Sequence, residues 1–365
     1  MKKIFFFMLY LCTALSCLAQ EPITIGKKYT LSSSILQEKR EFWVYLPPDY
    51  NHPDFAPARY PVVYLLDGDA NFHSFTGLQE ILSKGPYASI PQMIIVGILN
   101  TDRTRDLTPT ASGRKAYYDK KSTLYQQSGG NSQFIAFLQQ ELRPYIDSAY
   151  RTSGYNILNG HSFGGLTAAN ILLHHTRLFN AYIIIDPSLW WDEQLMLRQG
   201  DSILPKKNFS GTSIYVAMAH KEIVSQDTAT DHPTAIRAFE QQLQRIQPPG
   251  LRWKFRYYPE DDHGTVPLPA EFDGLKFIYS GHQVHVKQAT ADPSLITRHY
   301  DTLSARLGFP CKPAEHYLNW LGNYCIRIGK IDNAITIFEM AVRYYPQSGH
   351  ARSSLSAAIS KRKGG

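Results

Sequence analysis

Gly160-His-Ser-Phe-Gly164 sets Ser162 between two glycines, at the junction of an apolar run of strand length (155–159) and a segment of helical pattern (163–175). In that context a G-x-S-x-G sequence predicts a nucleophile elbow, a strained turn that lifts the serine Oγ above the end of a sheet. The glycines allow the strand and the helix to approach closely. The pattern alone is common, and a Gly/Ser turn without chemistry is the alternative, so the strand-turn-helix context is what favours a nucleophile.

Apolar runs of strand length recur along the chain and alternate with segments of helical pattern. Continuous apolar runs are typical of parallel strands covered by helices on both faces, whereas alternating residues indicate antiparallel strands. One helical segment begins at Asn131, a suitable N-cap, and another near Pro233, which suits a first turn. We therefore predict an α/β fold with a mostly parallel central sheet and helices on both faces. The expected strands are an antiparallel opening within 22–47, then 61–67, 93–99, 155–159, 182–186, 214–219 and, near an edge, 253–258.

The N-terminal residues have the pattern of a signal peptide. Lys2 and Lys3 precede the apolar run 4–15, and small residues lead to Ala19, so residues 1–19 are expected to be removed. The product would then be periplasmic or secreted, and a lipid anchor on Cys17 is the alternative. No later segment approaches the ~20 consecutive apolar residues that a membrane-spanning helix needs.

The charge of the chain is nearly balanced, with 38 Lys and Arg against 31 Asp and Glu. Such a mild excess does not favour a nucleic-acid partner, and it supports at most a preference for anionic ligands. No HExxH or paired CxxC pattern occurs, and the adjacent His174 and His175 diverge by about 100° on a helix. We therefore expect no metal site and no cofactor.

The sequence divides into a main domain at 20–285 and a helical tail at 293–365. The tail resembles one tetratricopeptide unit, and an ordinary helical hairpin is the alternative. A lone unit cannot bury its apolar face, so we expect the tail to pack on the main domain, on a second copy or on a protein partner. Cys311 and Cys325 either form one bridge or stay free. The tail positions that match the tetratricopeptide pattern are Leu321, Gly322, Gly329, Ala334, Phe338, Ala341 and Pro346.

A serine nucleophile needs a base, and that base needs an orienting acid. In elbow hydrolases the order along the chain is serine, acid, histidine. His263 directly follows the run 253–258 and is the predicted base. Glu222 lies three residues after the run 214–219 and is the favoured acid, while Asp227 or a Ser-His pair without a carboxylate stays open.

Acyl transfer also needs hydrogen-bond donors where negative charge develops on the carbonyl oxygen, and loss of one donor typically costs on the order of 3 kcal/mol. The N–H of Phe163, directly after the nucleophile, is one expected donor. The loop after the third strand, 65–69, is expected to supply the second, and Gly68 allows that loop to turn tightly.

Five motifs lie at the strand ends and turns. They are Leu65-Leu-Asp-Gly68, Asn100-Thr-Asp-Arg-Thr-Arg-Asp-Leu-Thr-Pro109, Gly160-His-Ser-Phe-Gly-Gly165, Asp186-Pro-Ser-Leu-Trp-Trp-Asp192 and Asp262-His-Gly264. With them, residues 25–282 resemble the putative-esterase branch of the α/β-hydrolases, which includes enterochelin esterase-like enzymes, feruloyl esterases and mycolyltransferases. The resemblance implies Ser162 as nucleophile, His263 as base and the Asp69 N–H as second oxyanion donor. It looks most like the periplasmic siderophore esterases, some of which work without a strong acid, so the role of Glu222 stays open.

Three further residues are candidates for substrate binding. Arg103 and Arg105 follow the fourth strand, at the edge where ligands of open α/β sheets bind, and are predicted to orient an anionic or catecholate substrate. The alternative is that one of them braces the loop by pairing with Asp102 or Asp106. Trp190 is predicted to form an aromatic wall, with core packing as the alternative.

These residues together predict a serine esterase that hydrolyses carboxylic esters through an acyl-enzyme. The expected substrates are siderophore lactones or acyl esters on polysaccharides. Two alternatives follow from the same features, because one fold hosts many functions. One is a binding or assembly protein that uses the scaffold and the helical tail, and the other is an acyltransferase that passes the acyl group to a sugar hydroxyl.

Overall fold

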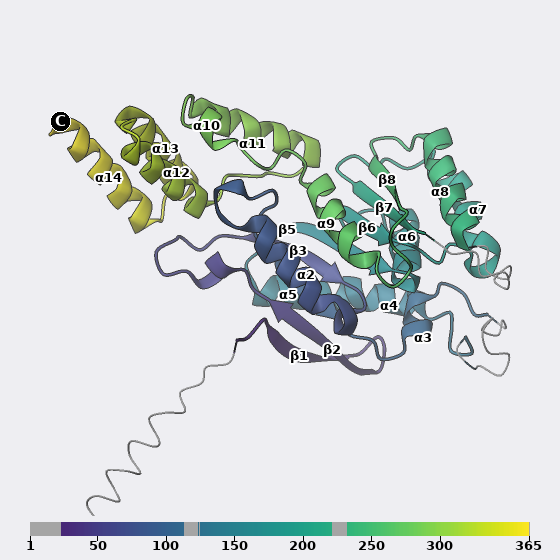
Figure 1. Ribbon diagram of the computed structural model, residues 1–365. Coiled ribbons are helices and arrows are strands. Elements are labelled where there is room, and N and C mark those ends of the chain that lie inside the picture. Colours follow the sequence, from purple (N-terminus) through teal and green to yellow (C-terminus); the bar gives the residue numbers. More distant parts are fainter. Residues whose placement is uncertain (1–22, 113–122, 124, 221–231, 365) are drawn as a thin grey trace, which may run out of the picture.

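The computed structural model describes residues 23–112, 123, 125–220 and 232–364, so the predicted signal peptide (1–19) lies outside it. At its centre is an eight-stranded sheet with the order β1-β2-β4-β3-β5-β6-β7-β8 (Figure 1). β2 is antiparallel to β1 and to β4, and the neighbouring strands from β4 to β8 are parallel. The strands are β1 Lys27–Ser33, β2 Glu38–Tyr45, β3 Tyr60–Leu65, β4 Ile94–Ile98, β5 Thr152–His161, β6 Ala181–Ile185, β7 Ser213–Ala219 and β8 Arg252–Tyr258.

The α/β-hydrolase fold predicted from the sequence is confirmed, including the antiparallel opening and the edge position of β8. Strands β4, β6 and β7 are buried along their whole length, because a parallel strand with helices on both faces has no side in water. β8 is exposed at alternating positions, as an edge strand allows.

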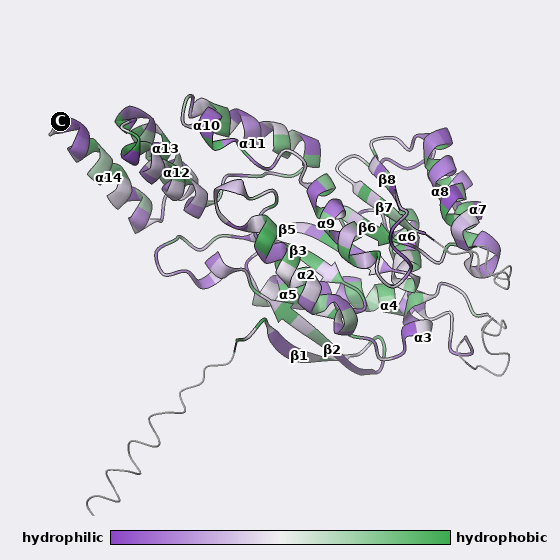
Figure 2. Ribbon diagram, viewed as in Figure 1, coloured by the Kyte–Doolittle hydropathy of each residue, from purple (hydrophilic) through white to green (hydrophobic). Residues whose placement is uncertain are grey.

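Helices cover both faces of the sheet, and each face has its own hydrophobic cluster. Successive strand residues point to opposite faces, so Val62 and Tyr64 of β3 pack in one cluster and Val63 and Leu65 in the other. α6 packs on β5 and β6 from one side, and α2 and α9 pack from the other. Hydrophobic colour gathers on the central strands (Figure 2). The helices of the main domain are α2 Gly68–Ser83, α3 Arg103–Leu107, α4 Asn131–Phe137, α5 Arg143–Ala149, α6 Phe163–His174, α7 Trp191–Ile203, α8 His232–Ile246 and α9 Pro267–Ile278.

Asn131 does not cap α4, so that prediction is wrong. Gly130 is the N-cap, and Asn131 is buried in the first turn. Its Nδ2 donates to the carbonyl oxygen of Asp106 at 2.6 Å, and its Oδ1 accepts from Asn170 at 2.7 Å. These tertiary contacts outweigh the local preference of asparagine for the cap position. The helical pattern that follows is interrupted by a π-helical turn at 138–142, which joins α4 to α5.

The residues after α9 form the helices of the tail, which lie beside the main domain (Figure 1). Gly322 of α12 lies where α12 packs on α13, and a Cβ there would come within 2.6 Å of the Phe338 ring. This contact fits the expected helical pair, and the tetratricopeptide assignment itself stays a prediction. Cys311 and Cys325 are free thiols. The tail helices are α10 Val286–Ala289, α11 Ser294–Leu307, α12 Glu315–Arg327, α13 Ile331–Tyr344 and α14 Gly349–Lys363.

The tail is tied to the main domain by polar contacts at the start of α12. The backbone N–H of Ala56 donates to Glu315 at 2.8 Å, and His316 contacts the carboxylate of Asp49. A cavity of about 770 Å³, lined mainly by aromatic and proline side chains from both parts, lies between them, and Ser162 does not line it. Within the described ranges, every helix is too short or too polar to cross a membrane.

A buried carboxyl group packs against the central strand β5. Oε1 of Glu271 in α9 accepts a hydrogen bond from Asn159 at 3.0 Å, and Oε2 has no partner among the described residues. Burial raises the pKa of Glu271 to about 8. Glu271 is therefore protonated in the folded protein at pH values where the unfolded chain would already have lost this proton.

We predict that replacing Gly322 with alanine destabilises the tail, because the new methyl group would overlap the Phe338 ring. The expected loss in the free energy of unfolding is about 1–3 kcal/mol. Gly77 in α2 is a matched control, since a Cβ there meets nothing within 4 Å. Gly77→Ala should instead raise stability by roughly 0.5–1 kcal/mol, because alanine favours a helix. Denaturant unfolding of both variants measures the difference, and equal effects would contradict the packing of α12 on α13.

We also predict that stability falls as pH rises from about 4.5 to about 8, the interval between the ordinary and the folded pKa of Glu271. In this window the folded state binds a proton that the unfolded state has released, so the free energy of unfolding decreases with pH. Glu271→Gln mimics the protonated carboxyl group and should raise the melting temperature at pH 8 more than at pH 5. The exposed Glu80→Gln serves as the control, and a pH-independent effect of Glu271→Gln would contradict the prediction.

Candidate active site

Ser162 lies at the turn between β5 and α6 in a backbone conformation that L-residues rarely adopt, with φ 60° and ψ −116°. Its N–H donates to the carbonyl oxygen of Ile185 at 3.0 Å, and its own carbonyl accepts from the N–H of Ser188 at 3.1 Å. Both bonds tie the turn to the end of β6. A strained serine in a strand-to-helix turn is the geometry of a nucleophile elbow.

The glycines around Ser162 allow the close approach that the turn requires. A Cβ at Gly160 would collide with the carbonyl group of Gly164, and one at Gly165 would come within 2.9 Å of Pro187. No residue with a side chain fits either position without moving the backbone. The sequence pattern therefore has a steric cause at both sites.

His263 follows β8 and reaches the same edge of the sheet. Its Nδ1 lies 2.6 Å from Oδ2 of Asp186, its side chain is 51% exposed, and its ring centroid is 4.4 Å from that of His161. The serine hydroxyl lies 3.4 Å from Oγ of Ser188, and among the described residues no hydrogen bond joins it to His263. Catalytic hydrogen bonds are often long or poorly aligned without substrate, so the Ser-His pair stays a prediction that rests on the elbow and on the contact of His263 with Asp186.

Asp186, the residue after β6, is the carboxylate that contacts His263. It has φ 38° and is almost fully buried, and its Oδ1 accepts from the N–H of Ala219 at 2.9 Å. Burial by itself would raise the pKa of Asp186, but hydrogen bonds from His232, His263 and Ala219 hold it well below its usual range. The carboxyl group is therefore ionised at neutral pH.

His232, the first residue of α8, contacts the same carboxylate oxygen. Its Nε2 lies 2.9 Å from Oδ2 of Asp186, and its ring packs edge-on against His263 with centroids 5.5 Å apart. Three side chains that can bind a metal ion therefore lie close together. One oxygen of Asp186 and one ring nitrogen each of His232 and His263 all lie within 4.8 Å of one another, and within the described ranges no other three His, Cys, Asp or Glu residues do so.

Glu222 and Asp227, the acids considered from the sequence, lie outside the described residues. The sequence analysis missed Asp186 because it looked for the acid after β7, whereas Asp186 comes directly after β6. Two signals pointed to it. Asp186 opens the motif 186–192, and it lies between Ser162 and His263 in the chain, as the serine, acid, histidine order requires.

The two predicted oxyanion donors lie in the first turns of two helices. Phe163 is the first residue of α6, and Asp69 is the second residue of α2. N–H groups in the first turn of a helix have no partner within it, and the helix dipole favours negative charge there. Gly68 brings this turn close to β4, since a Cβ on it would lie 2.6 Å from the backbone of Gly97.

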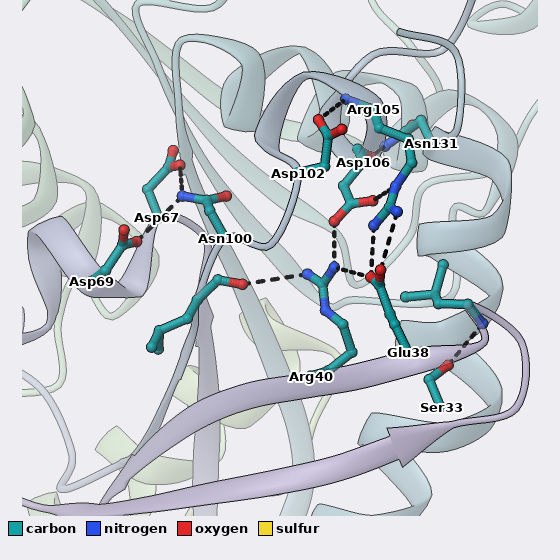
Figure 3. Close-up of polar contacts among 12 residues, drawn as sticks. Ser33, Glu38, Arg40, Asp67, Asp69, Asn100, Asp102, Arg105, Asp106 and Asn131 are labelled. Carbon is teal, nitrogen blue, oxygen red and sulfur yellow. Dashed lines mark hydrogen bonds and ion pairs between the residues drawn. The ribbon is translucent and has the colours of Figure 1, made fainter. Parts of the chain in front are cut away.

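Arg103 supports the loop that carries Asp69. Its Nε and Nη2 donate to the carboxylate of Asp67 at 2.6 and 2.9 Å. Asn100 donates to Asp67 at 2.7 Å and to Asp69 at 3.2 Å (Figure 3). Nη2 of Arg103 also lies 3.3 Å from the carbonyl oxygen of His161. Arg103 thus joins the loop after β3 to the elbow.

Arg105 belongs to a different cluster (Figure 3). Its guanidinium donates to Glu38 at 2.6 and 3.1 Å and to Asp106 at 2.8 Å, and Arg40 pairs with both of these acids. Arg40 and Asp106 are buried. All of the side-chain nitrogens of Arg105 are engaged, so the geometry favours the bracing role over substrate binding.

Trp190 is buried against the residue that follows the nucleophile. Its ring lies 6.2 Å from that of Phe163, 6.5 Å from Tyr125 and 5.7 Å from Trp191. Trp191 in turn donates from Nε1 to Thr110 at 3.0 Å. The cluster packs beside the elbow, so Trp190 combines core packing with a position next to the site.

His161, the residue before Ser162, packs its ring against that of His263, with centroids 4.4 Å apart. Burial, and then the neighbouring His263, lower the pKa of His161 to about 4, so this imidazole is neutral at physiological pH. Its Nε2 has no hydrogen-bond partner among the described residues. His161 therefore presents an uncharged ring to the side of His263.

Comparison with known proteins finds relatives for most of the chain. The family model described as "Putative esterase" matches residues 33–263, which include the elbow, Asp186 and His263. The chain is 27% identical over 240 residues to ferri-bacillibactin esterase BesA of Bacillus subtilis, spanning 63% of this chain and 81% of that protein. It is 27% identical over 254 residues to siderophore enterobactin esterase of Emericella nidulans, spanning 59% and 81%. The crystal structure of an IroE-like serine hydrolase from Shewanella oneidensis superimposes with a TM-score of 0.79 at 32% identity, covering 87% of this chain and 99% of that one.

Proposed function

Because this chain belongs to the family described as "Putative esterase", we propose that it is a serine esterase that hydrolyses siderophore esters through an acyl-enzyme. The observation that carries the proposal is the 2.6 Å contact between Nδ1 of His263 and Asp186, at the same sheet edge as a strained serine. The N-terminal pattern of residues 1–19 supports action in the periplasm or outside the cell.

The first chemical step is attack of Ser162 Oγ on the ester carbonyl carbon, while Nε2 of His263 takes the serine proton. Nδ1 of His263 keeps its proton and forms a hydrogen bond to Asp186 through it. Nε2 is therefore the nitrogen with a free lone pair. The tetrahedral intermediate then expels the alcohol, which takes the proton from His263. Water next attacks the acyl-enzyme with His263 again as base; the bond between the acyl carbon and Ser162 Oγ then breaks, Oγ takes the proton back from His263, and the carboxylic acid leaves.

Negative charge on the carbonyl oxygen is stabilised by the N–H groups of Phe163 and Asp69. Both belong to first helical turns, which favour an anion. The position of the Asp69 donor depends on Asp67, which Arg103 and Asn100 hold from the loop after β4. Arg103 therefore acts first as a positioning residue for this loop.

Siderophore esters are the favoured substrate class because two relatives are named for esterase activity on siderophores. Arg103 remains 34% exposed while it pairs with Asp67, so it can also face an anionic or catecholate group. Trp190 lies beside the elbow and suits the face of an aromatic ring. The guanidinium of Arg105 is fully engaged by Glu38 and Asp106, so we do not propose it as a substrate-binding residue.

We predict that Ser162→Ala and His263→Ala abolish turnover of p-nitrophenyl acetate, and that Asp186→Asn lowers kcat by roughly 10⁴-fold, because the wrong tautomer of His263 is then stabilised. A fluorophosphonate should label the wild type and not Ser162→Ala. Asp192→Asn, which changes a carboxylate of the same motif as Asp186, should retain most activity.

Glu222→Gln distinguishes the two candidate acids. Full activity in Glu222→Gln with loss in Asp186→Asn assigns the acid to Asp186, and the reverse result would return it to Glu222. Equal turnover by wild type and Ser162→Ala would refute the serine mechanism altogether.

We predict that kcat/KM for a catecholate trilactone exceeds that for feruloyl and acetyl sugar esters, because the catecholate oxygens can pair with the exposed part of the Arg103 guanidinium. Product analysis by chromatography, with and without an added sugar acceptor, measures this preference. A higher kcat/KM for the sugar esters would favour the polysaccharide alternative. Transfer of the acyl group to the acceptor would favour an acyltransferase.

A further inference from the structure

Two histidines share one carboxylate oxygen at the edge of the sheet. Nδ1 of His263 lies 2.6 Å and Nε2 of His232 lies 2.9 Å from Oδ2 of Asp186. A serine hydrolase needs only the first of these contacts, because one carboxylate orients one base. His232 therefore supplies a second imidazole nitrogen at the site, which helps keep Asp186 ionised but takes no proton in the reaction described above.

We propose that Asp186, His232 and His263 form a binding site for a divalent transition-metal ion of the Zn²⁺ type. Two imidazole nitrogens and one carboxylate oxygen are a donor set that Zn²⁺ takes in proteins. The three donor atoms come from the ends of β6 and β8 and the start of α8, so the fold itself brings them together. This site was not expected from the sequence, because its ligands are far apart in the chain and follow no metal-binding spacing.

The geometry is close to that of a metal site and needs only a small adjustment. Zn–N and Zn–O distances near 2.0–2.1 Å in a tetrahedral site separate neighbouring ligand atoms by roughly 3.3 Å. The present separations of 2.6 and 2.9 Å from Oδ2 are those of hydrogen bonds, which the ion would replace. His263 is half exposed and can move, whereas Asp186 is held by the N–H of Ala219 on its other oxygen. The carboxylate of Asp186 is thus a fixed ligand, and the ion would enter from the side of the exposed His263 imidazole.

Metal binding at this site would stop ester hydrolysis, a consequence that rests on the proposed function. An ion on Nδ1 of His263 displaces the Nδ1 proton, and a neutral imidazole then carries its remaining proton on Nε2. Nε2 is the atom that must accept the proton of Ser162. The ion would therefore convert the base into a group that cannot act as one, without touching the serine.

Isothermal titration of full-length Ser162→Ala with ZnCl₂ tests the site without any turnover. We expect binding of one ion that is weakened at least tenfold by His232→Ala and by Asp186→Asn in the same background, since loss of even an outer contact typically costs 10–100-fold. His232→Gln keeps a donor toward Asp186 and serves if the alanine variant does not fold, which circular dichroism shows. His174→Ala, a histidine that contacts Gln199 on another surface, should leave the titration unchanged.

Unchanged zinc affinity in the folded His232 variant, or loss of binding in His174→Ala, would overturn the proposed site. The inhibition is measured separately, as turnover of p-nitrophenyl acetate with ZnCl₂ and then with EDTA. The wild type and His232→Gln are compared, each relative to its own rate without metal. Zinc should inhibit the wild type reversibly and His232→Gln at least tenfold more weakly. If the wild type hydrolyses no ester, the proposed function fails while the titration still decides the metal site.

Discussion

The contact between His263 and Asp186 joins the loops that follow two strands, and in the proposed mechanism it fixes which imidazole nitrogen accepts the serine proton. The two residues are 77 positions apart and meet because β6, β7 and β8 run parallel, so that their carboxyl ends share one edge. Burying a carboxylate is costly unless several donors contact it. Here the N–H of Ala219 and two imidazoles do so, and the negative charge of Asp186 beside His263 is maintained at neutral pH.

Local patterns were sufficient to predict the sheet and the elbow. Continuous apolar runs mark β4, β6 and β7 because these strands have no side in water, and the glycines around Ser162 are required by contacts between β5 and α6. The position of Asn131 was not predictable from its capping preference. Its amide is used instead to join α4 to Asp106 and Asn170, contacts that depend on the packed fold.

Side chains of the same type have different roles that only three-dimensional contacts separate. Arg103 and Arg105 are two residues apart, yet one pairs with Asp67 beside the elbow and the other with Glu38 in a buried ion-pair network. The proposed acid was missed because carboxylates follow several strands, and the motif at 186–192 and the chain order did not show that Asp186 is the one that contacts His263. Asp186 is also in a positive-φ conformation, which the sequence does not encode in any simple way.

In the proposed mechanism, the strained backbone of Ser162 sets catalysis against stability at a single position. Glycine adopts φ 60° with ψ −116° readily, whereas a residue with a Cβ pays about 1–3 kcal/mol in such regions. Under the proposed function, the serine is thus maintained at this turn by the reaction and not by the fold. If the proposed ester cleavage were no longer under selection, a change to glycine here would relieve the backbone strain and leave a more stable, inactive protein.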